Sequence, residues 1–207
     1  MNKRNIIEKI FPDKHDFYEM LNNQAEIIAF GVDMFQNWLI SGSYEEKQKL
    51  FLCVKESDEA RMIMESKVIE AFSTPFNKID IFSISIAMNK IIKYAKSTLL
   101  SMDTFEVEPD DTIHTMVGKL KEGTDLLLES IEALKNNPIR SQENINKMKV
   151  IHTKVEQLYN DGMTIVFKIS DPMNAIKHRE IYHLIKEASL NLEDTVDIFE
   201  RIVIRLI

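Results

Sequence analysis

Residues 58–81 read DEARMIMESKVIEAFSTPFNKIDI. The first part has the pattern of an amphipathic helix, which we expect to end at the aromatic Phe72. Pro75 excludes the α conformation from the residue before it and has no backbone N–H to donate, so the helix must stop there. An acidic residue and an isoleucine, Asp80 and Ile81, then open the next helix. The stretch therefore predicts two long helices joined by a proline turn.

Residues 156–181, which read EQLYNDGMTIVFKISDPMNAIKHREI, repeat this order more weakly. The helix ends in Phe167, the break carries Pro172, and Glu180 with Ile181 opens the next helix. Self-similarity of this kind indicates that one structural unit occurs twice. We therefore expect two three-helix repeats that together form one compact domain, with the bounds 1–103 and 104–207.

The composition favours helices throughout the chain. Of the 207 residues, 44% are hydrophobic, and only five are Gly and five Pro. Apolar residues recur at steps of three and four, which predicts six helices of about 25 residues, each roughly 38 Å long. Helices of matched length joined by short turns pack antiparallel. The predicted fold is all-α, with two three-helix bundles laid side by side.

Caps and prolines give the expected helix bounds. Ser43 and Glu46 have the spacing of a capping box, Pro109 suits the first helical position, and Ser141 is expected to cap the next helix. The predicted helices cover about 15–40, 43–72, 77–101, 109–135, 141–167 and 173–207.

The net charge of −7 argues against two classes of partner. Nucleic-acid backbones and anionic lipid surfaces both select clustered Lys and Arg, so we expect no nucleic acid as a partner. The lone Cys53 lies in an apolar run and is expected to be a buried, reduced thiol. Residues 1–11 lack the apolar core of a secretory signal, and no run approaches the roughly 20 apolar residues of a membrane span. We expect a cytosolic protein.

Five features follow one another in a fixed order along the chain. They are Phe11-Pro12 with Phe17, Asp58, Thr74-Pro75-Phe76 with Asp80-Ile81, Phe167 with Asp171-Pro172, and Glu180-Ile181-Tyr182. In order and spacing they resemble the PhoU-like family of phosphate-transport regulators, in particular the branch that accompanies low-affinity phosphate transporters. The resemblance spans nearly the whole chain and implies the same fold of paired three-helix bundles.

The resemblance also implies a metal site in each repeat. In the family, an acidic pair four residues apart on the second helix faces a matching pair on the third, and the carboxylates converge on cations. Carried over to this chain, the positions are Val54 and Asp58 facing Asn89 and Lys93, and His152 and Glu156 facing Lys186 and Leu190. Only Asp58, His152 and Glu156 remain able to bind a metal readily.

We expect side-chain ion pairs instead of metal at these positions. An ammonium group beside a carboxylate supplies positive charge and repels a cation. We predict a pair of Glu156 with Lys186, a pair of Asp58 with Lys90 or Lys93, and no cofactor; bound iron, zinc or manganese is the alternative. The helix register places Asp58 opposite Asn89, Val54 opposite Lys93, Glu156 opposite Lys186, and His152 opposite Leu190.

Other motifs carry less weight. Glu180 and His183 have the E-x-x-H spacing of di-iron bundles, but such sites need a second copy, which the sequence lacks. His152 and Glu156 could hold zinc with help from another helix, although a hydrogen-bonded structural pair is the favoured interpretation. The sequence has no Gly-rich phosphate loop, no C-x-x-C and no recognisable nucleophile triad, so we expect no enzyme activity.

The resemblance implies a non-enzymatic regulatory or accessory protein of inorganic phosphate transport. Such a protein would act by contact with a membrane phosphate transporter, or with the machinery that controls it, from the cytoplasmic side. Two alternatives stay open: a metal-binding bundle that senses or stores cations, and a helical scaffold without a phosphate role. Long bundles with flat sides also allow a homo-oligomer.

Overall fold

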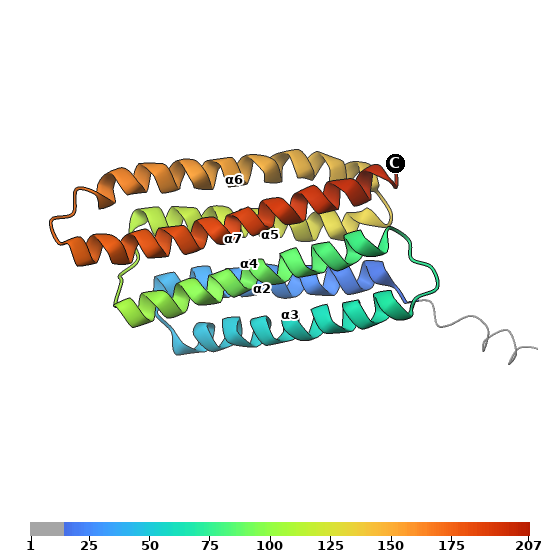
Figure 1. Ribbon diagram of the computed structural model, residues 1–207, viewed down its shortest axis with the longest axis horizontal. Helices are drawn as coiled ribbons and strands as arrows, with labels where there is room; N and C mark the ends of the chain where they lie inside the picture. Colours follow the sequence, from blue (N-terminus) through green and yellow to red (C-terminus); the bar gives the residue numbers. More distant parts are fainter. Residues whose placement is uncertain (1–14) are drawn as a thin grey trace, which may run out of the picture.

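The computed structural model describes residues 15–207, which form six α-helices and no strand (Figure 1). The helices are α2 (Phe17–Ser41), α3 (Tyr44–Glu70), α4 (Lys78–Phe105), α5 (Asp111–Leu134), α6 (Pro138–Val166) and α7 (Pro172–Ile204). The predicted all-α fold is confirmed. Phe11 and Pro12, which belong to the resemblance, lie outside the described residues.

Consecutive helices run antiparallel, and they pack in two sets (Figure 1). In one set α2, α3 and α4 contact one another, and in the other α5, α6 and α7 do so. The long helix α4 lies along α7, and α2 lies along α5, so one hydrophobic core continues through both sets. Within residues 15–207, no helix combines the length and the apolar character that a membrane span requires.

The proline turn between α3 and α4 is closed by its own side chains. Thr74 Oγ1 donates a hydrogen bond to the carbonyl oxygen of Phe76 at 2.6 Å. The Phe76 ring is buried and packs edge-on against Tyr18, with 5.3 Å between the ring centroids. Asn77 caps α4, since its Oδ1 accepts from the backbone N–H of Ile79 at 2.8 Å. The turn is thus an ordered junction between α3, α4 and the start of α2.

Two predicted helix starts are wrong. Pro109 precedes α5, because the carboxylate of Asp110 caps that helix by accepting from the N–H of Ile113 at 2.8 Å. Ser141 lies inside α6, where Pro138 takes the first position and Asn137 is the cap. The buried Ser141 hydroxyl instead donates to the carbonyl oxygen of Ser130 on α5, at 2.8 Å. Pro109 and Ser141 match local preferences for the start of a helix, but in each case another nearby residue is the cap.

Two predicted helix ends are also displaced. Helix α3 stops at Glu70, and the exposed Phe72 lies beyond it in the turn. Helix α4 continues past residue 101 to Phe105 and ends at Glu106, whose positive φ of 54° turns the chain out of the helix. A glycine or proline usually marks such an end, and neither stands at this position, so the sequence pattern does not reveal it.

Cys53 is buried, as predicted, among the apolar side chains of the first helix set. Burial raises the pKa of its thiol to about 11, and the negative charge of Glu56 adds to the effect.

Gly162 on α6 allows this helix to lie close to α7. A Cβ added at this position would meet the Tyr182 ring at 2.6 Å. The hydroxyl of Tyr182 donates a hydrogen bond to Asp110, which fixes the ring across the gap between α7 and the start of α5.

Candidate functional site

The first of the two sites at which the resemblance implies a metal lies between α3 and α4 and holds a single carboxylate. Asp58 Oδ1 accepts hydrogen bonds from Lys93 Nζ at 2.6 Å and from Asn89 Nδ2 at 2.9 Å. Asn89 is buried, and its Oδ1 accepts from Ser57 Oγ at 2.9 Å. These contacts join the two helices through one continuous chain of hydrogen bonds.

Lys93 balances the charge of this site. Partial burial would raise the pKa of Asp58, but the hydrogen bonds from Lys93 and Asn89 outweigh it and hold that pKa below its ordinary value. The carboxylate is therefore ionised at neutral pH and already has a cation beside it. Of the two lysines considered from the sequence, Lys93 is the partner, whereas Lys90 is exposed to solvent.

Val54, the fourth position of the first site, is buried in the core. The register placed Lys93 opposite this residue, but the ammonium group reaches Asp58, one helical turn away on α3. A charged group beside a buried valine would lose its hydration without a partner. The long lysine side chain instead spans the turn to the nearest carboxylate.

The second site lies between α6 and α7 and contains the predicted pair of Glu156 with Lys186. Lys186 Nζ is 3.2 Å from Glu156 Oε1. The same ammonium group lies over the ring of Tyr159, 5.1 Å from its centroid, in a cation–π contact. A positive charge that belongs to the protein therefore stands where the resemblance implies a metal.

His152 lies next to this pair and is buried, with 6% of its surface exposed. Its Nδ1 is 3.1 Å from Ser189 Oγ. Its Nε2 is 3.4 Å from Glu193 Oε2 and 3.9 Å from Glu156 Oε1. The imidazole thus connects a hydroxyl on α7 to carboxylates of both α6 and α7.

Leu190 does not face His152, contrary to the register. Its side chain is 36% exposed, whereas Ser189 is fully buried. Each helical residue is turned by about 100° from the one before it, so the residue next to an inward-facing one points elsewhere. The register identifies the level on α7 that faces His152, but not which side of α7 turns toward it.

Ser189 and Glu193 are site residues that the sequence reading missed. Together with Lys186 they occupy positions i, i+3 and i+7 of α7, which share one helix face. This spacing is the signal that could have identified them, since Lys186 was already assigned to the site.

The side chains at the two sites do not fit the metal clusters that the resemblance implies. The first offers one carboxylate, and the second offers His152, Glu156 and Glu193 close to the ammonium group of Lys186. Within residues 15–207, no group of three or more His, Cys, Asp or Glu side chains is arranged to hold a metal ion. The arrangement instead supports ion pairing and hydrogen bonding between neighbouring helices.

Asp80, at the start of α4, forms a separate junction. Its carboxylate is buried and accepts hydrogen bonds from Arg201 and Arg205 at the end of α7. The sequence predicts that Asp80 opens α4 after the first proline turn, but it does not identify these partners. The junction ties the first turn of one helix set to the last turn of the other.

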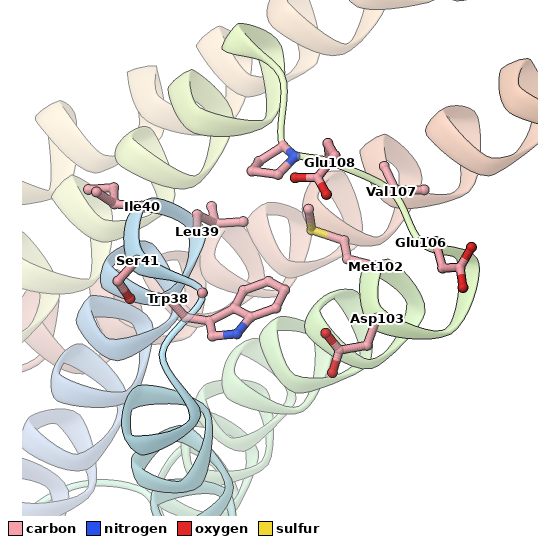
Figure 2. A pocket seen from close by; sticks show the side chains of 11 residues that line it. Trp38, Leu39, Ile40, Ser41, Met102, Asp103, Glu106, Val107 and Glu108 are labelled. Atoms are coloured by element: carbon pink, nitrogen blue, oxygen red, sulfur yellow. The ribbon is translucent and has the colours of Figure 1, made fainter.

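A pocket of about 500 Å³ lies elsewhere, between the end of α2 and the segment that follows α4 (Figure 2). Figure 2 shows the Trp38 ring with Asp103 and Glu108 around this space. Asp103 is paired with Lys47 on α3. None of the residues at the two sites described above lines this pocket. Its lining includes residues 106–109, which lie between α4 of one helix set and α5 of the other.

Comparisons with known proteins bear on the fold. No protein-family model matches the sequence, and no curated protein matches it significantly. The chain superposes with a TM-score of 0.77 and 11% identity on a PhoU-like protein from Shewanella oneidensis MR-1, covering 92% of this chain and 100% of that one. A second protein from the same organism, described as a candidate PhoU-like phosphate regulatory protein, gives a TM-score of 0.75 and 12% identity with the same coverage. The chain therefore has the fold of the PhoU-like proteins.

Proposed function

We propose that this protein is a non-enzymatic regulatory or accessory protein of inorganic phosphate transport, which acts by binding a partner protein. The observation that carries the proposal is the likeness of fold over 92% of the chain to PhoU-like proteins, one of them described as phosphate regulatory. The partner would be a membrane phosphate transporter, contacted at its cytoplasmic face, or the machinery that controls the transporter.

Phosphate uptake in a deletion strain tests this function. Radiolabelled phosphate uptake is measured in phosphate-rich and phosphate-poor medium, in the parent strain, in the deletion strain and in a strain that carries the gene on a plasmid. We expect deletion to change the uptake rate in at least one medium and the plasmid copy to restore it. Identical uptake in all three strains under both conditions would reject the phosphate role and leave the scaffold alternative.

We further propose that Lys93 and Lys186 take the place of bound cations. Each ammonium group lies within ion-pair distance of the carboxylate that a metal would need, at 2.6 Å and 3.2 Å. Binding a metal there would bring two positive charges together and break an existing pair.

Thermal unfolding with and without a chelator separates this proposal from the cation-sensing alternative. A ligand that binds the folded state raises the melting temperature, and its removal lowers it. We expect the same melting temperature before and after dialysis against EDTA, and no increase on addition of manganese or zinc. A melting temperature that falls with EDTA and recovers with metal would support the cation-sensing function instead.

A further inference from the structure

A groove of about 530 Å³ runs along the surface between α5 and α6. Figure 1 shows these two helices side by side, with α6 at one edge of the molecule. The floor of the groove is apolar and consists of Leu126 from α5 with Val150 and Ile151 from α6. Val150 leaves 66% of its surface exposed, Leu126 is half-buried, and Ile151 is buried beneath them. The groove thus has an apolar floor on which Val150 and part of Leu126 are open to solvent.

Lysines form the rim of this groove on both helices. Lys119 stands on α5, and Lys147 and Lys154 stand on α6. The single carboxylate in the lining, Glu122, is neutralised by Lys119 at 2.6 Å. Lys147 and Lys154 donate hydrogen bonds only to neutral amide oxygens, and neither has an ion-pair partner among residues 15–207. The rim of this groove is therefore positively charged, although the protein has a net charge of −7.

The spacing of these residues suits a third helix. Lys147, Val150, Ile151 and Lys154 occupy positions i, i+3, i+4 and i+7 of α6. On α5, Lys119, Glu122 and Leu126 occupy i, i+3 and i+7. Two helices that present such faces form a trough into which the apolar stripe of another helix packs, with charged residues meeting along its edges. The expected occupant is therefore rod-shaped, with an apolar stripe flanked by acidic residues.

Charge distinguishes between the possible occupants. A second copy of this chain that docked through the same groove would bring two sets of rim lysines together, because a symmetric dimer interface contacts itself. A flat anionic bilayer would meet the groove but also much of a molecule with a net charge of −7. A single acidic helix touches only the groove, so it gains the attraction of the lysines without the repulsion of the rest.

We propose that the groove between α5 and α6 binds an amphipathic helix of a partner protein, in which Asp or Glu residues flank an apolar stripe. This inference deepens the proposed regulatory function and rests on it for its biological role. Leu126 and Val150, over the buried Ile151, receive the apolar stripe, while Lys147 and Lys154 pair with the flanking carboxylates.

A binding titration with the full chain and defined peptides tests the proposal. The probe is a fluorescein-labelled helical peptide with leucines at heptad a and d positions and glutamates beside them; the control peptide has lysine for every glutamate. The test variants are the double variant Lys147→Glu with Lys154→Glu, and Val150→Asp. The matched control is Lys55→Glu with Lys90→Glu, which makes the same charge change on α3 and α4. All these side chains are at least partly exposed, and circular dichroism checks the fold of each variant.

The expected result is binding of the acidic peptide and none of the lysine peptide. The double variant and Val150→Asp should each weaken binding by about tenfold or more, and the control variant by less than about twofold. Absence of binding to the acidic peptide, or equal loss in test and control variants, would overturn the proposal. Binding to phosphatidylglycerol vesicles that depends on Lys147 and Lys154, without peptide binding, would assign the groove to a membrane. The titration involves no phosphate, so its outcome is independent of the uptake experiment.

Discussion

Arg205, at the end of α7, donates a hydrogen bond to Asp80, in the first turn of α4, with 2.5 Å between Nη1 and Oδ2. Arg201 adds two longer hydrogen bonds of 3.4 Å to the other carboxylate oxygen. Arg205 and Asp80 lie 125 residues apart in the chain, and only 7% of the Asp80 side chain is exposed. The contact makes the two helix sets depend on each other.

Replacing Asp80 is expected to weaken the joint between the helix sets. The variant Asp80→Ala should lower the free energy of unfolding by about 1 to 3 kcal/mol, because it removes the ion pairs of a buried carboxylate. The loss is no larger because both arginines are half exposed and regain some hydration. Asp103→Ala, which removes a surface pair with Lys47, should cost less than about 1 kcal/mol. Urea denaturation followed by circular dichroism gives both values. Equal, small effects of the two variants would contradict a joining role for Asp80.

The stability contributed by Asp58 should depend on pH. Its folded-state pKa lies below the ordinary value, so its contribution is present above an unfolded-state pKa of about 3.9 and is lost as the pH falls through the lower, folded-state pKa. Asp58→Asn should therefore be less stable than the native protein at about pH 7, and the difference should shrink below about pH 4. Urea denaturation across this range measures it, with Glu59→Gln as a control for an exposed carboxylate on the same helix. A difference that stays constant with pH would show that the lost stability does not come from the charge of Asp58.

Gly162 is expected to tolerate no methyl group. An alanine there would press its Cβ against the Tyr182 ring, which cannot move aside because its hydroxyl is bound to Asp110. The predicted loss is about 1 to 2 kcal/mol, net of the helix propensity that alanine gains over glycine. Gly118→Ala is the matched control, since its Cβ would make an ordinary contact with Gln36 and should stabilise the helix by up to about 1 kcal/mol. Thermal melts that give the same sign for both variants would contradict the packing.

Cys53 should be inert in the folded protein. Burial raises the pKa of its thiol to about 11, so little thiolate exists near neutral pH, and only 3% of the residue is exposed to reagents. Ellman's reagent should react slowly with the native protein and rapidly once urea unfolds it. Fast reaction in native buffer would place the thiol at the surface.

The six helices and their antiparallel order follow from the sequence because long apolar periodicities and two proline breaks are local signals. The helix starts at Asp111 and Pro138 are harder to place, since Asp110 is the cap where Pro109 is predicted to be the first helical residue, and Asn137 is the cap where Ser141 is predicted. Cap preferences are shared by several neighbouring residues, and the packing of the helix decides among them.

At each of the two sites, the sequence predicts the ion pair because a lysine can be aligned with a carboxylate across the proline turn. The pair of Glu156 with Lys186 follows from that alignment. The contacts of His152 with Ser189 and Glu193 depend on which side of α7 faces α6. The packing of α7 against α4 and α5 sets that orientation. The junction of Asp80 with Arg205 joins residues from different repeats, and no local pattern connects them.

The metal content of the purified protein tests most directly the central proposal that Lys93 and Lys186 take the place of bound cations. The chain is purified without chelator from cells grown with iron, zinc and manganese, and elemental analysis gives the moles of each metal per mole of protein. We predict far less than one metal per chain, and the same result for the variant Glu156→Gln. Stoichiometric iron, zinc or manganese that is lost in Asp58→Asn or Glu156→Gln would contradict the account.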